Sequence, residues 1–217
     1  MQTNQGNREK CYKCYRPQSS CMCQYINSFE TNTKFIVLMH PKEFKKVKNG
    51  TGHFTHLSLK NSELFVGVDF TNHKRINEII STYNSYILYP SQNALNLSKD
   101  SRDIDTGSGI AIFLIDSTWS CASKIFTKSK NLQNLKHMSF DSTKLSQFKI
   151  KEQPQDYCLS TIESTLTVLE LLNAYGLENI EHKNLYNFLN PFNEMINYQL
   201  KCLENRKINA VRFKKYN

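Results

Sequence analysis

The chain has 217 residues, of which 39% are hydrophobic, so it is long and apolar enough for one sizeable domain. Lys and Arg outnumber Asp and Glu by 28 to 19, and the formal charge of +9 favours a phosphate-rich partner. The longest apolar runs, residues 35–39 and 110–115, fall far short of the roughly 20 residues that cross a bilayer. Residues 1–10 lack the apolar stretch of an export signal, so we expect a cytoplasmic protein without membrane contact.

Four of the seven cysteines lie close together near the N-terminus, in the spacing C-x2-C-x6-C-x-C. They are Cys11, Cys14, Cys21 and Cys23. In a reducing compartment such a cluster is better explained by a tetrahedral metal than by disulfides, and an all-thiolate set is typical of structural zinc. The surrounding segment has little apolar surface, so metal binding would supply most of its folding free energy. Four unligated cysteines or a redox pair are the alternatives, since the C-x-C pair is tighter than in ordinary zinc ribbons.

The body of the chain alternates apolar runs with segments of helical character. The runs read as buried strands are residues 34–40, 64–68, 86–89 and 110–115. Residues 55–60 and 75–81 lie between them and read as helices. This alternation predicts βαβ units, and therefore an α/β fold with a mainly parallel sheet and flanking helices.

Helices dominate the C-terminal part. Residues 161–175 place leucines on one stripe, and Gly176 is the expected C-cap. A last helix should begin near Pro191 and turn Met195 and Leu200 inward. The tail from residue 206 is basic, and it reads either as a solvated end or as a nucleic-acid contact. We thus expect a zinc-binding segment at 1–30, a catalytic domain at 31–205 and a basic tail at 206–217.

Polar residues follow three of the predicted strands, at the edge where open α/β sheets bind ligands. They are residues 40–43 (His-Pro-Lys-Glu), 89–91 (Tyr-Pro-Ser) and 116–119 (Asp-Ser-Thr-Trp). Asp116 comes directly after an apolar run and shortly before a helix that contains Ala122 and Ile125. From its position alone, capping of that helix is the commoner role for this aspartate, and a chemical role is the other.

The stretch from Asp116 to Trp119 resembles the D-x-T-W signature of the DTW-domain family. Four further landmarks of that family occur in the same order. They are the cysteine cluster with Arg16-Pro17, His40-Pro41-Lys42-Glu43, Tyr89-Pro90-Ser91 and Leu159-Ser160-Thr161-Ile162-Glu163. Two departures are that Ser117 replaces a glycine common in the signature, and that Lys149 and Lys151 stand in a segment that is usually rich in arginine.

The resemblance implies a tRNA-uridine aminocarboxypropyltransferase related to the SPOUT superfamily, with an α/β sheet tied into a C-terminal trefoil knot. The implied reaction moves the 3-amino-3-carboxypropyl group of S-adenosylmethionine to N3 of a tRNA uridine and releases methylthioadenosine. N3 is a weakly acidic imide, so a carboxylate beside it suits a general base, and Asp116 is the candidate. Thr118 would position that carboxylate or the cofactor. Trp119 would offer its indole to an adenine, to a uracil or to the core.

The resemblance also implies that three loops cradle S-adenosylmethionine. The residues concerned are Leu88, Pro90, Ser91, Ile115, Asp116, Ser117, Thr118, Leu159, Ser160 and Thr161. Without the family in view, Ser160, Thr161 and Glu163 read as the start of a helix.

Transfer RNA is the expected partner. Lysines that would receive its phosphates are Lys42, Lys45, Lys46, Lys48, Lys149 and Lys151, although solvated faces are the commoner reading of such runs. Tyr12 and Tyr15, beside Lys13 and Arg16, are candidates for stacking on an unpaired base. Two other functions fit the same residues, an RNA methyltransferase of the SPOUT type and a non-catalytic, zinc-containing RNA-binding protein. Both a monomer and a homodimer are compatible with the sequence.

Overall fold

The computed structural model describes residues 9–45, 50–99, 104–141, 145–148 and 158–204. In these ranges the chain forms a six-stranded sheet with the order β2-β1-β5-β3-β6-β4, in which all paired strands are parallel. The strands are β1 (Lys34–Met39), β2 (Ser62–Val66), β3 (Asn84–Leu88), β4 (Leu95–Asn96), β5 (Ile110–Asp116) and β6 (Lys136–Ser139). The predicted α/β fold with a parallel sheet is confirmed.

The centre of the sheet is buried on both faces. All six residues of β1 and six of the seven in β5 are buried. Side chains alternate between two hydrophobic clusters, with Phe35 and Val37 in one and Ile36 and Leu38 in the other. A strand covered on both faces needs apolar side chains at every position, which explains the unbroken apolar runs in the sequence.

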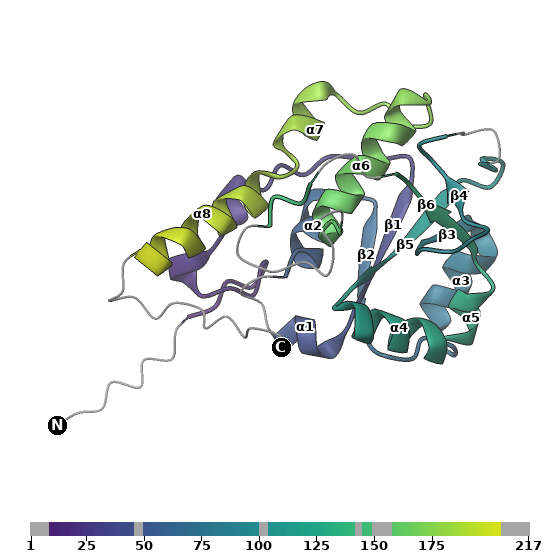
Figure 1. The fold of residues 1–217 in the computed structure, drawn as a ribbon, viewed down its shortest axis with the longest axis horizontal. Helices are drawn as coiled ribbons and strands as arrows, with labels where there is room; N and C mark the ends of the chain where they lie inside the picture. Colours follow the sequence, from purple (N-terminus) through teal and green to yellow (C-terminus); the bar gives the residue numbers. More distant parts are fainter. Residues whose placement is uncertain (1–8, 46–49, 100–103, 142–144, 149–157, 205–217) are drawn as a thin grey trace.

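Helices cover both faces of this sheet (Figure 1). They are α1 (Pro41–Lys45), α2 (Gly52–Ser58), α3 (Lys74–Thr82), α4 (Trp119–Lys128), α5 (Lys130–Gln133), α6 (Thr161–Ala174), α7 (His182–Asn187) and α8 (Asn190–Glu204). The cluster on one face contains side chains of α3, α4 and α5, and the cluster on the other contains side chains of α2, α6 and α8. Two short 3-10 turns, η1 (Gln18–Ser20) and η2 (Cys23–Tyr25), precede β1.

The late helices follow the sequence pattern. Leu169 and Leu172 of α6 and Met195 of α8 are fully buried in the same core. Gly176 has a φ of +73° directly after α6, and the N–H of Leu177 donates to the carbonyl of Leu172. This is the Schellman arrangement, in which a residue with positive φ ends a helix, so the predicted glycine cap is confirmed.

Other elements differ from the sequence-based expectation. The strand predicted at 64–68 spans Ser62–Val66, and the helix predicted at 55–60 begins earlier, at Gly52. The strands β4 and β6 and the helix α5 were not predicted. β6 has the sequence Lys-His-Met-Ser and buries only Met138, so it lacks the apolar run that marks the central strands.

Several predicted features fall on residues outside the described ranges. They are the basic tail at 206–217, Lys46, Lys48, Lys149 and Lys151. The trefoil knot depends on the path between β6 and α6, which includes residues 142–144 and 149–157, also outside these ranges. Within the described part of the chain, no helix combines the length and the apolar character that crossing a membrane requires.

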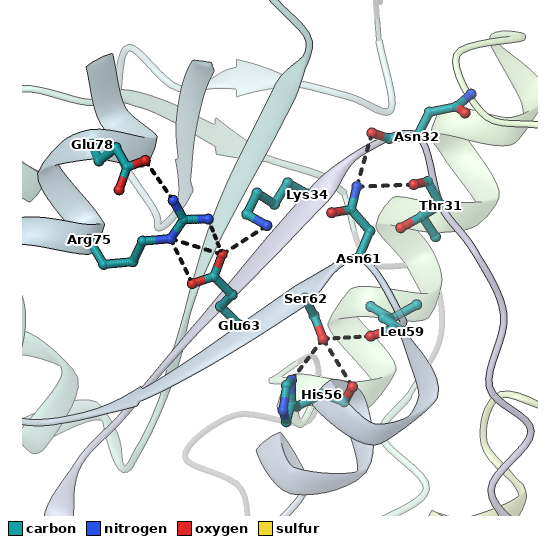
Figure 2. Close-up of polar contacts among 10 residues, drawn as sticks. All are labelled: Thr31, Asn32, Lys34, His56, Leu59, Asn61, Ser62, Glu63, Arg75 and Glu78. Carbon is teal, nitrogen blue, oxygen red and sulfur yellow. Dashed lines mark hydrogen bonds and ion pairs between the residues drawn. The ribbon is translucent and has the colours of Figure 1, made fainter. Parts of the chain in front are cut away.

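A network of charged side chains ties α3 to the sheet (Figure 2). Glu63 of β2 accepts hydrogen bonds from the guanidinium of Arg75 in α3, and the Nζ of Lys34 in β1 lies 2.9 Å from its Oε1. Arg75 also pairs with Glu78 in the same helix. Hydrogen bonds from Arg75, and then from Lys34, lower the pKa of Glu63 from 4.5 to about 2. Because Lys34 is only 8% exposed, its charge depends on Glu63 for compensation.

Glu63→Gln should lower the free energy of unfolding by about 1–3 kcal/mol near neutral pH, because it removes the anion from this hydrogen-bonded cluster. The depressed pKa means that the contribution of Glu63 is complete above about pH 5 and disappears as the pH falls towards 2. Urea titrations of wild type and variant should therefore converge under acidic conditions.

Glu78→Gln is the matched control, because the Glu78 side chain is 62% exposed and its replacement should cost less than about 0.5 kcal/mol. Equal losses from the two variants, or a difference that does not depend on pH, would contradict the role given to Glu63.

Candidate active site

Asp116 is the last residue of β5 and lies at the carboxyl edge of the sheet, where it is 6% exposed. β1 and β5 are in register at Met39 and Asp116, and the N–H of His40 donates to the Asp116 carbonyl at 3.2 Å. The helices that follow these strands, α1 and α4, start at the same edge (Figure 1). Because parallel α/β sheets bind ligands beyond this edge, Asp116 stands where a chemical role is expected.

The first turns of two helices flank the Asp116 carboxylate. Its Oδ1 accepts a hydrogen bond of 2.7 Å from the hydroxyl of Thr161, the first residue of α6. Gly52, the first residue of α2, also lies against it, since a Cβ built on Gly52 would stand 2.5 Å from both Cγ and Oδ2 of Asp116. Only a glycine leaves room for the carboxylate at this distance. Both helix starts carry partial positive charge, which stabilises a negative charge between them.

The contacts of Asp116 differ from the capping role suggested by its sequence position. α4, the next helix along the chain, begins at Trp119 and has Thr118 as its N-cap residue. The hydroxyl of Thr118 lies 3.4 Å from the hydroxyl of Ser120. The hydroxyl that donates to Asp116 is instead that of Thr161, in a different helix. Trp119 is 47% exposed, so the alternative of a core role for its indole is wrong.

The start of α6 is fixed by a buried carboxylate. The N–H and the hydroxyl of Ser160, the N-cap residue, both donate to Oε2 of Glu163, at 2.8 and 2.6 Å. Glu163 is 6% exposed and also accepts hydrogen bonds from the hydroxyl of Ser146 and the N–H of Gln147. Glu163 thus joins two segments of chain and sets the position of Thr161. The helix start predicted from these residues is confirmed.

The remaining residues predicted to bind a cofactor lie on neighbouring segments of this edge. Leu88 ends β3, the strand beside β5, and Pro90 and Ser91 after it are exposed. Ile115, Ser117 and Leu159 are half-buried. Three predicted segments therefore approach one edge of the sheet from three elements, namely residues 88–91, 115–118 and 159–161. The hydrogen bond between Asp116 and Thr161 joins the second and third of these segments directly.

A hollow of about 410 Å³ lies elsewhere, between α6 and α7. Its lining residues are Leu166, Glu170, Asn173, Ala174, His182, Leu185 and Tyr186. None of the predicted site residues is among them, so this hollow belongs to the helical face of the molecule and not to the edge that carries Asp116.

The cysteine element (residues 9–25) gathers the four clustered thiols. The Sγ atoms of Cys11, Cys14, Cys21 and Cys23 all lie within 4.8 Å of one another. Two of these separations are 3.5 Å, for Cys11 and Cys23, and 3.8 Å, for Cys14 and Cys21. Four sulfurs bound tetrahedrally to zinc at about 2.3 Å would stand about 3.8 Å apart. Burial raises the pKa values of Cys21 and Cys23, whereas the backbone N–H groups of Cys14 and Lys13 lower the pKa of Cys11 to about 6, which favours its thiolate. The cluster can therefore hold a zinc ion.

Arg16 connects the cysteine element to the helices. Its guanidinium is 2% exposed and lies 4.6 Å from the ring centroid of Phe54 in α2. Its Nη2 donates to the sulfur of Met195 in α8 at 3.0 Å. Burial lowers the pKa of Arg16 to about 10, and the negative charges of the nearby thiolates oppose this shift. Arg16 is thus an internal cation at neutral pH and does not face an RNA base.

A second contact between the cysteine element and the helices is made by three rings. Tyr15 has a φ of +57° and lies 5.4 Å from Phe44 of α1 and 5.2 Å from His53 of α2, between ring centroids. His53 is buried, and this burial lowers its pKa to about 4. His53 follows Gly52 in the chain, so this ring contact adjoins the residue that packs against the Asp116 carboxylate.

Gly52 is the site residue that the sequence analysis missed. A glycine at the start of a helical run is the available signal, but the same pattern occurs at ordinary helix starts. Gly52 matters because Asp116, which is distant in the sequence, packs against it. This contact exists only in the tertiary structure.

Comparison with known proteins decides the family. The DTW domain matches residues 8–200, which is most of the chain. The chain belongs to the DTW domain family. The resemblance noted from the motifs is thereby confirmed.

Three curated relatives carry the name tRNA-uridine aminocarboxypropyltransferase 2. The protein of Drosophila melanogaster is 29% identical over 177 residues, which is 78% of this chain and 68% of that protein. The protein of Macaca fascicularis is 28% identical over 200 residues (89% and 64%), and that of Mus musculus is 29% identical over 170 residues (76% and 57%). The chain thus spans 57–68% of the length of these relatives. No solved structure matches the chain.

Gly52→Ala tests the close approach to Asp116. The added methyl group would overlap the carboxylate, so we expect the free energy of unfolding to fall by about 1–3 kcal/mol. Gly50→Ala is the control, because a Cβ at Gly50 meets nothing within 4 Å and should change the stability by less than about 0.5 kcal/mol. Denaturant unfolding measures both values. Full stability of Gly52→Ala would show that the two groups are not in contact.

Proposed function

We propose that this protein is a tRNA-uridine aminocarboxypropyltransferase, which transfers the 3-amino-3-carboxypropyl group of S-adenosylmethionine to N3 of a tRNA uridine. Membership of the DTW domain family and the names of three relatives support this proposal. The single observation that carries the chemistry is the Asp116 carboxylate, held at the carboxyl edge between the first turns of α2 and α6. A SPOUT-like C-terminal trefoil knot and a cytoplasmic location belong to the same proposal.

Asp116 acts as the general base. N3 of uridine is weakly acidic, and its proton must leave before the nitrogen lone pair can attack a carbon atom. The carboxylate takes that proton while N3 forms the new bond to carbon. The Thr161 hydroxyl keeps one carboxylate oxygen in place, which leaves the orientation of the group fixed during the reaction. Trp119, exposed at the start of α4, supplies a flat surface beside the reacting base.

S-adenosylmethionine supplies the transferred group on a sulfonium, and the electron pair of the broken carbon–sulfur bond leaves with methylthioadenosine. Residues 88–91, 115–118 and 159–161 would hold the adenosine, because they share one edge of the sheet. The exposed Pro90 and Ser91 and the half-buried Ser117 leave polar backbone accessible there. A carboxylate at this edge also attracts a cationic donor.

Zinc in the cysteine element has a structural role in this proposal. Four thiolates fill a tetrahedral coordination sphere and leave no position for a reactive water. Its contribution would be to fold residues 9–25, which contact α2 and α8 through Arg16 and α2 also through Tyr15.

The purified protein should contain about one zinc per chain, measured by elemental analysis. Cys14→Ser should lose most of this zinc, because Cys14 is a fully buried member of the cluster. Cys121→Ser is the control, since Cys121 is equally a buried cysteine but lies in α4, outside the cluster, and should keep the metal. Retention of zinc by Cys14→Ser would rule out the proposed ligand set.

Asp116→Asn should reduce aminocarboxypropyl transfer by about 10²- to 10⁴-fold, which is the usual contribution of a positioned general base. The amide keeps an oxygen that can accept from Thr161, so thermal stability should stay close to that of wild type. Mass analysis of tRNA nucleosides after incubation with S-adenosylmethionine measures the product.

Wild-type turnover by Asp116→Asn would remove this residue from the mechanism. In the wild-type protein, an aminocarboxypropyl adduct on uridine supports the proposal. A methyl adduct would instead indicate a methyltransferase, and an unchanged tRNA would indicate a non-catalytic RNA-binding protein.

A further inference from the structure

The described charges are divided unevenly between two parts of the molecule. Residues 161–204, which form α6, α7 and α8, contain six glutamates and two lysines. The cysteine element, α1 and α4 have the opposite balance, with six exposed lysines against two glutamates, Glu9 and Glu43. These lysines are Lys10, Lys13, Lys42, Lys45, Lys124 and Lys128. A polyanion is therefore attracted to the second group of elements and repelled by the first.

The three lysine-bearing elements are connected around the Asp116 site. Tyr15 of the cysteine element contacts Phe44 of α1, with 5.4 Å between ring centroids. α1 begins directly after His40, and α4 begins three residues after Asp116. The backbone N–H of His40 donates to the carbonyl of Asp116. The cysteine element is thus linked through α1 to the segment that bonds to Asp116.

Exposed aromatic rings accompany these lysines. The Tyr12 side chain is 94% exposed at the tip of the cysteine element, beside the exposed Lys13. Trp119 is 47% exposed at the start of α4. Tyr15 is the less available of the two tyrosines because its ring packs on Phe44. Lysines interleaved with exposed aromatic rings are the pattern with which proteins hold phosphates and stack unpaired bases of single-stranded RNA.

We propose that the cysteine element, α1 and α4 form one tRNA-binding surface around Asp116, in which Tyr12 stacks on an unpaired base near the modified uridine. Lys13, Lys42, Lys45 and Lys124 contact the phosphates on either side. This inference rests on the proposed function for its choice of tRNA as the substrate. It gives the cysteine element a direct part in substrate binding, in addition to its structural role.

The phosphate contacts are tested by replacing Lys13, Lys42, Lys45 and Lys124 together with alanine in the full-length protein. Binding of unmodified tRNA transcripts is followed by fluorescence anisotropy at several salt concentrations. Each lost phosphate contact lowers the slope of log affinity against log salt by about 0.7 to 0.9, so the slope should fall by roughly 3. The control replaces Lys183 and Lys201, both exposed and both in the acidic part, and should leave the slope unchanged. Equal slopes for the quadruple variant and wild type would overturn the proposal.

The stacking contact is tested by Tyr12→Ala and Tyr12→Phe. Loss of one stacked base should weaken tRNA binding by roughly 5- to 100-fold in Tyr12→Ala, whereas Tyr12→Phe keeps a ring and should bind like wild type. Zinc content, measured on both variants, shows that the cysteine element is intact. Wild-type affinity of a zinc-loaded Tyr12→Ala would overturn the role of Tyr12.

These readouts are separate from catalysis. If the wild-type protein binds tRNA through this surface but forms no aminocarboxypropyl adduct, the proposed function fails and the binding surface stands. If the adduct forms and the lysine variants bind normally, the function stands and the binding surface is wrong.

Discussion

The structure depends on one carboxylate that is buried at a strand end, where the proposed function requires a base. A buried anion is costly unless donors and dipoles surround it. Here the hydroxyl of Thr161, at the start of α6, donates to the carboxylate, and Gly52, at the start of α2, packs closely against it. The contacts that stabilise the Asp116 charge therefore also set the positions of α2 and α6. Hydrogen bonds to Glu163 hold the start of α6 as well.

The cysteine element is coupled to this site through charge. Arg16 is an internal guanidinium, and an internal cation needs a compensating anion nearby. The thiolates of the cysteine cluster supply negative charge on one side, and the ring of Phe54 accepts the cation on the other. Phe54 belongs to α2, the helix that begins at Gly52. The cysteine cluster, which can hold a zinc ion, is thus connected through α2 to the residue that packs against Asp116.

Local patterns were sufficient for part of this arrangement. The strands β1 and β5 were predictable because burial on both faces leaves an unbroken apolar run. The same run placed Asp116 at a strand end, but position alone favoured helix capping, and its proposed chemical role came from the family resemblance. The contact of Asp116 with Thr161 joins residues 45 positions apart, and the approach of Gly52 appears only when α2 packs beside it. Neither leaves a local sequence pattern. Similarly, Arg16 in a basic, aromatic segment reads as a surface cation, and its burial follows from docking onto α2 and α8.

Within the described residues, the glutamates of α6–α8 are separated from the lysines of α1, α4 and the cysteine element, and these charges form an electric dipole. In the field of a polyanion such a dipole experiences a torque before any contact forms. If tRNA binds the proposed surface, this torque would favour an approach with Asp116 towards the polyanion, which shortens the search for a productive orientation. This effect acts on the rate of association, and added salt weakens it by shortening the range of the field.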